Sequence, residues 1–227
     1  MSCHPSQTLE ANLILGKLKI YIPKMIDGQT AVKTMRDEGS NNWRQMEWIG
    51  FWLEHLVEKK IVTSIGGQTG PRYGRTVFDL KRKHVWDLKV HLDGSNWLIL
   101  NDREAVNTCI KDNSGIGYLI VEGHAKFDDD GKFKEWHDKQ KGTKSSYEIE
   151  RVRRGAPSRR RKKVFTPKRL IALWIPTLND LISADKDGWV KGFQKGMRNS
   201  NGSLRREKFQ INVSEVPNNY ILVDQNL

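Results

Sequence analysis

Two aspartates and a lysine stand close together in residues 76–91, which read TVFDLKRKHVWDLKVH. The alternation of polar and apolar residues predicts two β-strands joined by a short loop at residues 82–84. Because side chains alternate between the faces of a strand, Asp79 would share one face with Asp87 and Lys89. Directly opposed residues have Cβ atoms about 5 Å apart, and carboxylates that close repel each other unless a cation lies between them. We therefore expect a divalent metal ion between the aspartates, with the lysine pointing at the same spot.

The other face of the predicted hairpin is apolar. Phe78 and Leu80 of the first strand and Trp86, Leu88 and Val90 of the second would pack together on a core. An Asp-x-Lys on an amphipathic strand can also be an ordinary solvated face. The basic character of the chain and an acidic helix just upstream favour a functional site.

That upstream helix is predicted at residues 43–60 from the helical spacing of its apolar residues. Glu47, Glu54 and Glu58 fall near one another on a second face of this helix. Gly50 lies in its middle, where glycine costs roughly 1 kcal/mol relative to alanine. Such a glycine is understandable where another backbone, or DNA, approaches closely. The alternative for the three glutamates is simple exposure to solvent.

Together these segments resemble the PD-(D/E)xK nuclease fold, whose best-known members are the type II restriction endonucleases. The resemblance covers roughly residues 40–130 and rests on the helix segment GFWLE followed by VFDLK and VWDLKVH. Two features depart from the family pattern. Phe78 stands where the motif has proline, and only eight residues separate Asp79 from Asp87, which is short for the family.

The resemblance implies an α/β (α+β) fold with a central mixed β-sheet flanked by helices, a restriction-endonuclease-like core. It also implies a Mg²⁺-dependent endonuclease that hydrolyses double-stranded DNA at specific sequences. Asp79 and Asp87 would hold one or two Mg²⁺ ions. Lys89 would orient or deprotonate the attacking water and neutralise charge on the phosphorane, and Glu54 would contact a metal-bound water. Glu47 is the second choice for this helix glutamate.

The charge of the chain agrees with a polyanionic partner, either nucleic acid or an anionic membrane. Lys and Arg number 39 against 27 Asp and Glu, a formal net charge of +12. Ten of the 19 residues in 151–169 are basic and none is acidic. Such a run can also be solvated, disordered or a localisation signal. Because arginine pairs bidentately with phosphate or guanine, we expect DNA contacts from this run. The expected residues are Arg151, Arg153, Arg154, Arg159, Arg160, Arg161, Lys162 and Lys163.

The remaining segments predict further strands and helices around the hairpin. Strands are expected at residues 96–102 and 115–127, with helices at 102–111 and 133–142. Glu122 on the second of these strands is the next carboxylate to consider for the site. Asp128 to Gly131 are expected to form a hairpin turn. Thr166 and Pro167 predict the start of a helix that Pro176 ends or kinks. The segment 11–26 is read as a short helix or strand that leads into a loop, and the tail 209–223 as a closing strand pair.

The whole chain, residues 1–227, is expected to form a single nuclease domain with a basic DNA-binding region around residues 145–169. No apolar run is long enough to cross a bilayer and no signal peptide is evident. Cys3 and Cys109 are too few for a disulfide framework or a four-ligand zinc site. These features predict a cytoplasmic protein, and the resemblance to restriction endonucleases implies a bacterial or archaeal source.

A homodimer is expected because palindromic DNA sites mirror a two-fold symmetric protein. Two other functions fit the same residues. The chain could be a non-catalytic, sequence-specific DNA-binding protein with structural carboxylates, or a nuclease that processes structured RNA.

Overall fold

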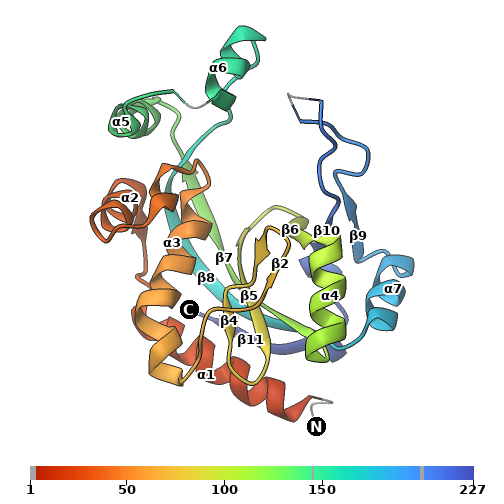
Figure 1. Ribbon diagram of the computed structural model, residues 1–227. Coiled ribbons are helices and arrows are strands. Elements are labelled where there is room, and N and C mark those ends of the chain that lie inside the picture. The colour runs from red at the N-terminus through yellow and green to blue at the C-terminus, as the bar shows by residue number, and fades with distance from the viewer. Residues whose placement is uncertain (1–3, 145, 200–201) are drawn as a thin grey trace.

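A computed structural model describes residues 4–144, 146–199 and 202–227 of the chain (Figure 1). Its centre is a six-stranded sheet in the order β1-β8-β7-β5-β4, and β11 also pairs with β8. The strands are β1 (Ile26–Asp27), β4 (Leu80–Lys81), β5 (Val85–Leu92), β7 (Ile116–Phe127), β8 (Lys162–Ile175) and β11 (Ile221–Asn226). β5 runs parallel to β7, whereas the other pairs are antiparallel. The predicted mixed central sheet is therefore confirmed.

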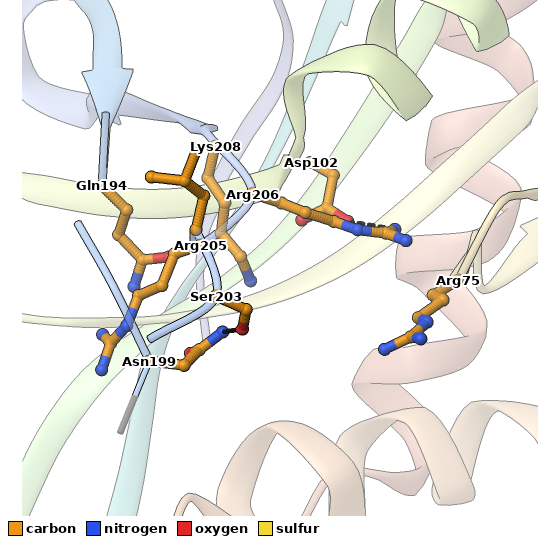
Figure 2. A pocket seen from close by; sticks show the side chains of 9 residues that line it. Arg75, Asp102, Gln194, Asn199, Ser203, Arg205, Arg206 and Lys208 are labelled. Atoms are coloured by element: carbon orange, nitrogen blue, oxygen red, sulfur yellow. Dashed lines mark hydrogen bonds and ion pairs between the residues drawn. The ribbon is translucent and has the colours of Figure 1, made fainter. Parts of the chain in front are cut away.

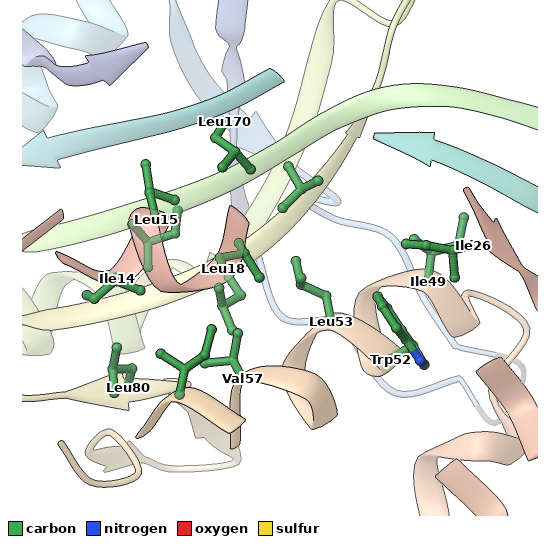
Figure 3. Close-up of a cluster of buried hydrophobic side chains, with 14 of the residues drawn as sticks. Ile14, Leu15, Leu18, Ile26, Ile49, Trp52, Leu53, Val57, Leu80 and Leu170 are labelled. Carbon is green, nitrogen blue, oxygen red and sulfur yellow. The ribbon is translucent and has the colours of Figure 1, made fainter. Parts of the chain in front are cut away.

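Helices cover one face of this sheet. α1 (Pro5–Tyr21), α2 (Gly28–Asp37), α3 (Trp48–Val57) and α5 (Lys132–Lys141) contribute side chains to a core that includes Trp86, Leu88 and Trp174 of the sheet. Figure 3 shows α1 and α3 residues of this core, among them Leu18, Leu53 and Trp52. The N-terminal segment, for which helix and strand were both open, is thus the helix α1.

The opposite face carries a second layer of mixed structure. A three-stranded sheet has the order β6-β10-β9 and joins α4 and α7 in a separate core. The elements are β6 (Trp97–Asp102), α4 (Arg103–Asn113), α7 (Leu178–Lys186), β9 (Val190–Phe193) and β10 (Lys208–Asn212). A small hairpin, β2 (Arg72–Tyr73) and β3 (Thr76–Val77), lies next to α4. The helices flank the central sheet on both faces, as predicted.

The helix predicted after Thr166 is wrong, because this segment belongs to the long strand β8. Residues 170–175 are buried throughout, since helices cover one face of β8 and the second layer covers the other. A strand buried on both faces reads as a continuous apolar run, which periodicity does not distinguish from a helix. Pro167 is tolerated because it lies opposite Gly123, where the register of β7 and β8 shifts in a bulge.

The predicted turn at Asp128 to Gly131 and the predicted strand pair of the tail are also wrong. Asp128 does not lie in a hairpin turn. Its carboxylate accepts hydrogen bonds from the backbone N–H groups of Phe133 (3.0 Å) and Lys134 (2.8 Å) and so caps the start of α5. The tail is not one strand pair, because β10 joins the second sheet whereas β11 pairs with β8.

Cys109 is a buried free thiol, and Cys3 lies outside the described residues. Within the part of the chain that the structure describes, no helix combines the length and apolarity needed to cross a membrane.

Candidate active site

The predicted pairing of the two aspartates follows from the register of β4 and β5. Leu80 lies opposite Trp86 and Lys81 opposite Val85, so one further step places Asp79 opposite Asp87. Asp79 itself lies between β3 and β4, where the chain bends. This bend breaks the alternation that was expected to put Phe78 and Leu80 on one face. Phe78 packs in the second layer and Leu80 packs against α1 and α3, so that prediction is wrong.

Both aspartates are held by hydrogen bonds from neighbouring elements. The Oδ2 atom of Asp79 accepts the backbone N–H of Leu88 at 2.7 Å. Asp87 is buried, and its Oδ1 accepts a hydrogen bond of 2.8 Å from the side-chain amide of Asn101 on β6. Its Oδ2 forms an ion pair with the ammonium group of Lys89. The Asp-x-Lys segment therefore lies on a central strand and not on a solvated face.

Glu54, Asp79, Asp87 and Lys89 line one pocket of about 640 Å³, which we call the carboxylate pocket. Glu54 comes from α3, which packs against β5. The structure thus brings together the four residues predicted as catalytic, from a helix, a bend and a central strand. Gly50, one turn before Glu54, also lines the pocket, and a side chain at this position would meet no atom within 4 Å.

The electrostatics of the carboxylate pocket are dominated by burial and by repulsion among the acids. Burial raises the pKa of Glu54 to about 7, with Asp87 adding to the rise and Lys89 opposing it. Burial and the nearby Asp87 and Glu54 carboxylates also raise the pKa of Asp79 well above its usual range. For Lys89, burial lowers the pKa, but Asp87 and the other acids outweigh this effect and raise it. Three acids thus share one ammonium group, an arrangement that a further cation would stabilise.

The donors in the pocket are of the kind that Mg²⁺ prefers. Mg²⁺ is commonly held by one or two carboxylates together with waters and substrate phosphates. Asp79 and Asp87 supply such carboxylates, and the buried Oδ1 of Asn101 accepts no hydrogen bond from any described residue. Among the described residues no three His, Cys, Asp or Glu side chains already form a compact metal-holding group. The residues therefore fit a metal that shares its coordination with water and substrate.

Sequence reasoning missed the polar residues that β6 brings to this pocket. Asn101 and Asp102 end β6 and line the pocket together with Arg75 of the β2–β3 turn. The Oδ2 atom of Asp102 accepts a 3.1 Å hydrogen bond from the hydroxyl of Thr76. The only signal in the sequence was the change from WLIL to Asn-Asp at the end of the predicted strand.

The other two candidate glutamates do not belong to the floor of the site. Glu47 lies at the rim of the pocket, where it forms an ion pair with Lys162. Glu122 does not line the pocket. Its carboxylate contacts His91 (2.8 Å) and Arg169 (3.3 Å) farther along the sheet.

The basic run is largely neutralised by acids from other parts of the chain and by glutamates that precede it. It forms part of α6 (Ser146–Arg153), a loop and the start of β8. Arg161 is buried, donating to His137 at 3.0 Å and forming an ion pair with Asp138 at 2.7 Å, so its role is structural. Most other members of the run also have acidic partners: Arg151 with Glu148, Arg153 and Arg154 with Glu150, Arg160 with Asp129, Lys162 with Glu47 and Lys163 with Asp130.

Comparison of the chain with protein-family models, curated proteins and solved structures gives no match. The site is therefore interpreted from its own geometry.

Proposed function

We propose that this protein is a Mg²⁺-dependent endonuclease of the PD-(D/E)xK type that cleaves double-stranded DNA by phosphodiester hydrolysis, as a type II restriction enzyme does. The observation that carries the proposal is the convergence of Asp79, Asp87, Lys89 and Glu54 on one pocket. Their placement supports a restriction-endonuclease-like core, because the Asp-x-Lys lies on a central strand beside a parallel neighbour and the glutamate on a preceding helix.

Each residue of the pocket has a role that follows from its charge. Asp79 and Asp87 would hold Mg²⁺, which when bound supplies positive charge for the phosphate and the leaving oxygen. Glu54, with its pKa raised to about 7 by burial, is suited to accept a proton from the attacking water. Lys89 keeps its proton because of the surrounding acids, so it stabilises negative charge on the phosphate. The resemblance allowed Lys89 either to orient or to deprotonate the attacking water. In this proposal Glu54 takes the proton and Lys89 does not.

A direct assay tests the proposal. Purified protein is incubated with plasmid and phage DNA, with Mg²⁺ and with EDTA, alongside the Asp87→Asn variant. We expect discrete fragments that require Mg²⁺ and that disappear in the variant. Sequencing of the fragment ends then gives the recognition sequence and the cut position. Absence of cleavage from every DNA and structured RNA tried would refute the nuclease.

The second candidate is a DNA-binding protein without catalytic activity. The ion pair between Lys89 and Asp87 favours it, because this contact satisfies a buried carboxylate without any metal. A gel shift of DNA that never leads to cleavage in Mg²⁺ would support this function over the nuclease.

A further inference from the structure

A second pocket, which we call the arginine pocket, opens beside the carboxylate pocket. It has a volume of about 560 Å³ and shares Arg75, Asp102 and Lys208 with the carboxylate pocket. Its walls come from the β2–β3 turn and from the described part of the segment between β9 and β10. Figure 2 shows Arg75 reaching in from one side and Arg205, Arg206 and Lys208 from the other.

Ion pairs and a backbone hydrogen bond hold the end of the segment that carries Arg205 and Arg206, just before β10. Arg206 forms an ion pair of 3.1 Å with Asp102, and Glu207 forms one of 3.1 Å with Arg103. The backbone N–H of Arg103 also donates to the carbonyl of Glu207 at 2.9 Å. Arg205 and Lys208 on either side of this pair are therefore held next to the pocket.

Three cations of the arginine pocket have no acidic partner among the residues that the structure describes. Arg75, Arg205 and Lys208 form no ion pair with any acid in the described ranges, and the Nε of Arg205 is buried without a hydrogen-bond partner. Asp102, the acid in the lining, is already paired with Arg206. Unpaired guanidinium groups facing one space are a site for a phosphate, which accepts several hydrogen bonds at once. In contrast, most basic residues of the run at 151–163 form ion pairs with acids of the same chain.

The arginine pocket is also the last of three adjoining pockets that share lining residues. The carboxylate pocket shares Glu47 and Phe51 with a larger hollow between α3, α5 and α6, so the carboxylates lie between two cation-bearing spaces. In Figure 1, α5 and α6 and the segment between β9 and β10 rise at the same end of the molecule. A polynucleotide that follows these three pockets passes over the carboxylates.

We propose that the arginine pocket binds the backbone phosphates that flank the scissile phosphate, through Arg75, Arg205 and Lys208. This inference rests on the proposed nuclease function, because the flanking phosphates are defined by cleavage in the carboxylate pocket. By fixing the register of the strand, the three cations place one phosphodiester over Asp79 and Asp87.

The test compares three double variants of the full-length protein. Arg75→Ala/Arg205→Ala removes two cations, Arg75→Lys/Arg205→Lys retains their charge, and Lys111→Ala/Lys186→Ala removes two exposed cations from α4 and α7 as a matched control. Affinity for a short duplex is measured in EDTA over a series of salt concentrations. Each lost phosphate contact should lower the slope of log K against log salt by about 0.9. We expect a lower slope in the first variant alone.

Chemically modified DNA then locates the contacts. A neutral methylphosphonate next to the cleaved bond should weaken binding of the wild-type protein but leave binding of Arg75→Ala/Arg205→Ala unchanged. An unaltered salt slope in this variant, together with normal wild-type cleavage, would overturn the inference and leave the nuclease standing. A lower slope in a protein that cleaves nothing would refute the nuclease and retain the arginine pocket as a phosphate-binding surface.

Discussion

The buried ion pair of Asp87 and Lys89 gives the sharpest prediction for a single residue. Asp87→Asn removes ligand charge at nearly constant volume and still offers Asn101 an acceptor, so the fold should persist. Cleavage should fall by a factor of about 10³ or more, because several kcal/mol of charge stabilisation are lost and each 1.36 kcal/mol is tenfold in rate. Single-turnover kinetics measure the cleavage rate, and a thermal melt measures the stability of the fold. Near-native cleavage would show that the active site is elsewhere.

Lys89→Met tests the lysine without leaving a cavity. The variant should lose most of its cleavage, because the charge that stabilises the phosphate is gone. Its affinity for Mg²⁺ should rise, since Asp87 no longer shares its charge with an ammonium group. Calorimetric titration with Mg²⁺ separates this outcome from simple unfolding, which would abolish metal binding as well.

At the scale of an element, Gly50 makes the helix α3 less stable than it would be with alanine at this position. Gly50→Ala should stabilise the protein by roughly 0.5–1 kcal/mol, because alanine is the better helix former and no atom lies within 4 Å of the added methyl group. If substrate backbone passes over this turn of the helix, the same methyl group should weaken DNA affinity. Denaturant unfolding measures the gain in stability, and a binding titration on the same sample measures the loss of DNA affinity. Unchanged DNA affinity would show that the DNA strand does not pass over this turn of α3.

The basic run divides into structural and exposed members. Arg161→Ala should destabilise the fold by about 2 kcal/mol, because it removes a buried guanidinium and leaves the buried ring nitrogen of His137 without its hydrogen-bond donor. Arg160→Ala, at an exposed ion pair with Asp129, should change stability by less than about 1 kcal/mol. Urea unfolding of the two variants measures the contrast. Equal effects would contradict the burial of Arg161.

For the whole molecule, the shared charge of the carboxylate pocket links stability to pH. Glu54 has its pKa raised from 4.5 to about 7, so the folded state binds this proton more tightly than the unfolded state does. The stability that this proton contributes is complete below 4.5 and is lost as the pH rises through 7. The melting temperature of Glu54→Gln, minus that of the wild type, should therefore increase across this window in EDTA.

Mg²⁺ should reverse the trend, because metal binding requires deprotonated carboxylates and strengthens as the pH rises. The melting temperature of the wild-type protein should rise more on addition of Mg²⁺ above pH 7 than below pH 7. A melting difference between Glu54→Gln and wild type that stays constant with pH would show that the glutamate is not buried among other acids.

Several features could be predicted from the sequence because they depend on local pattern. The short loop between Lys81 and Val85 was sufficient to predict that Asp79 faces Asp87, since a short loop leaves few registers, and alternation along β5 put Lys89 on the same face as Asp87. The bend at Asp79, which splits the first predicted strand into β3 and β4, could not be predicted from that alternation. Helical spacing predicted one helix over residues 43–60; α3 covers Trp48–Val57 of it and carries Glu54, whereas residues 43–44 belong to a separate 3-10 helix and residues 58–60 to a π-helical turn. The mixed sheet followed from apolar segments separated by turns.

Tertiary structure alone decided the rest. The run at 170–175 is a strand because the layers on both sides bury it, and burial on both faces removes the periodicity that identifies a strand. The charge of residues 151–163 is largely cancelled by acids such as Asp129, Asp130 and Asp138, which a count of local charge does not include. Conversely, Arg75 lies far from Arg205 and Lys208 in the sequence, and the three cations meet only because the β2–β3 turn and the segment before β10 converge. Local periodicity determines elements, whereas the neighbours of a charge are determined by how those elements pack.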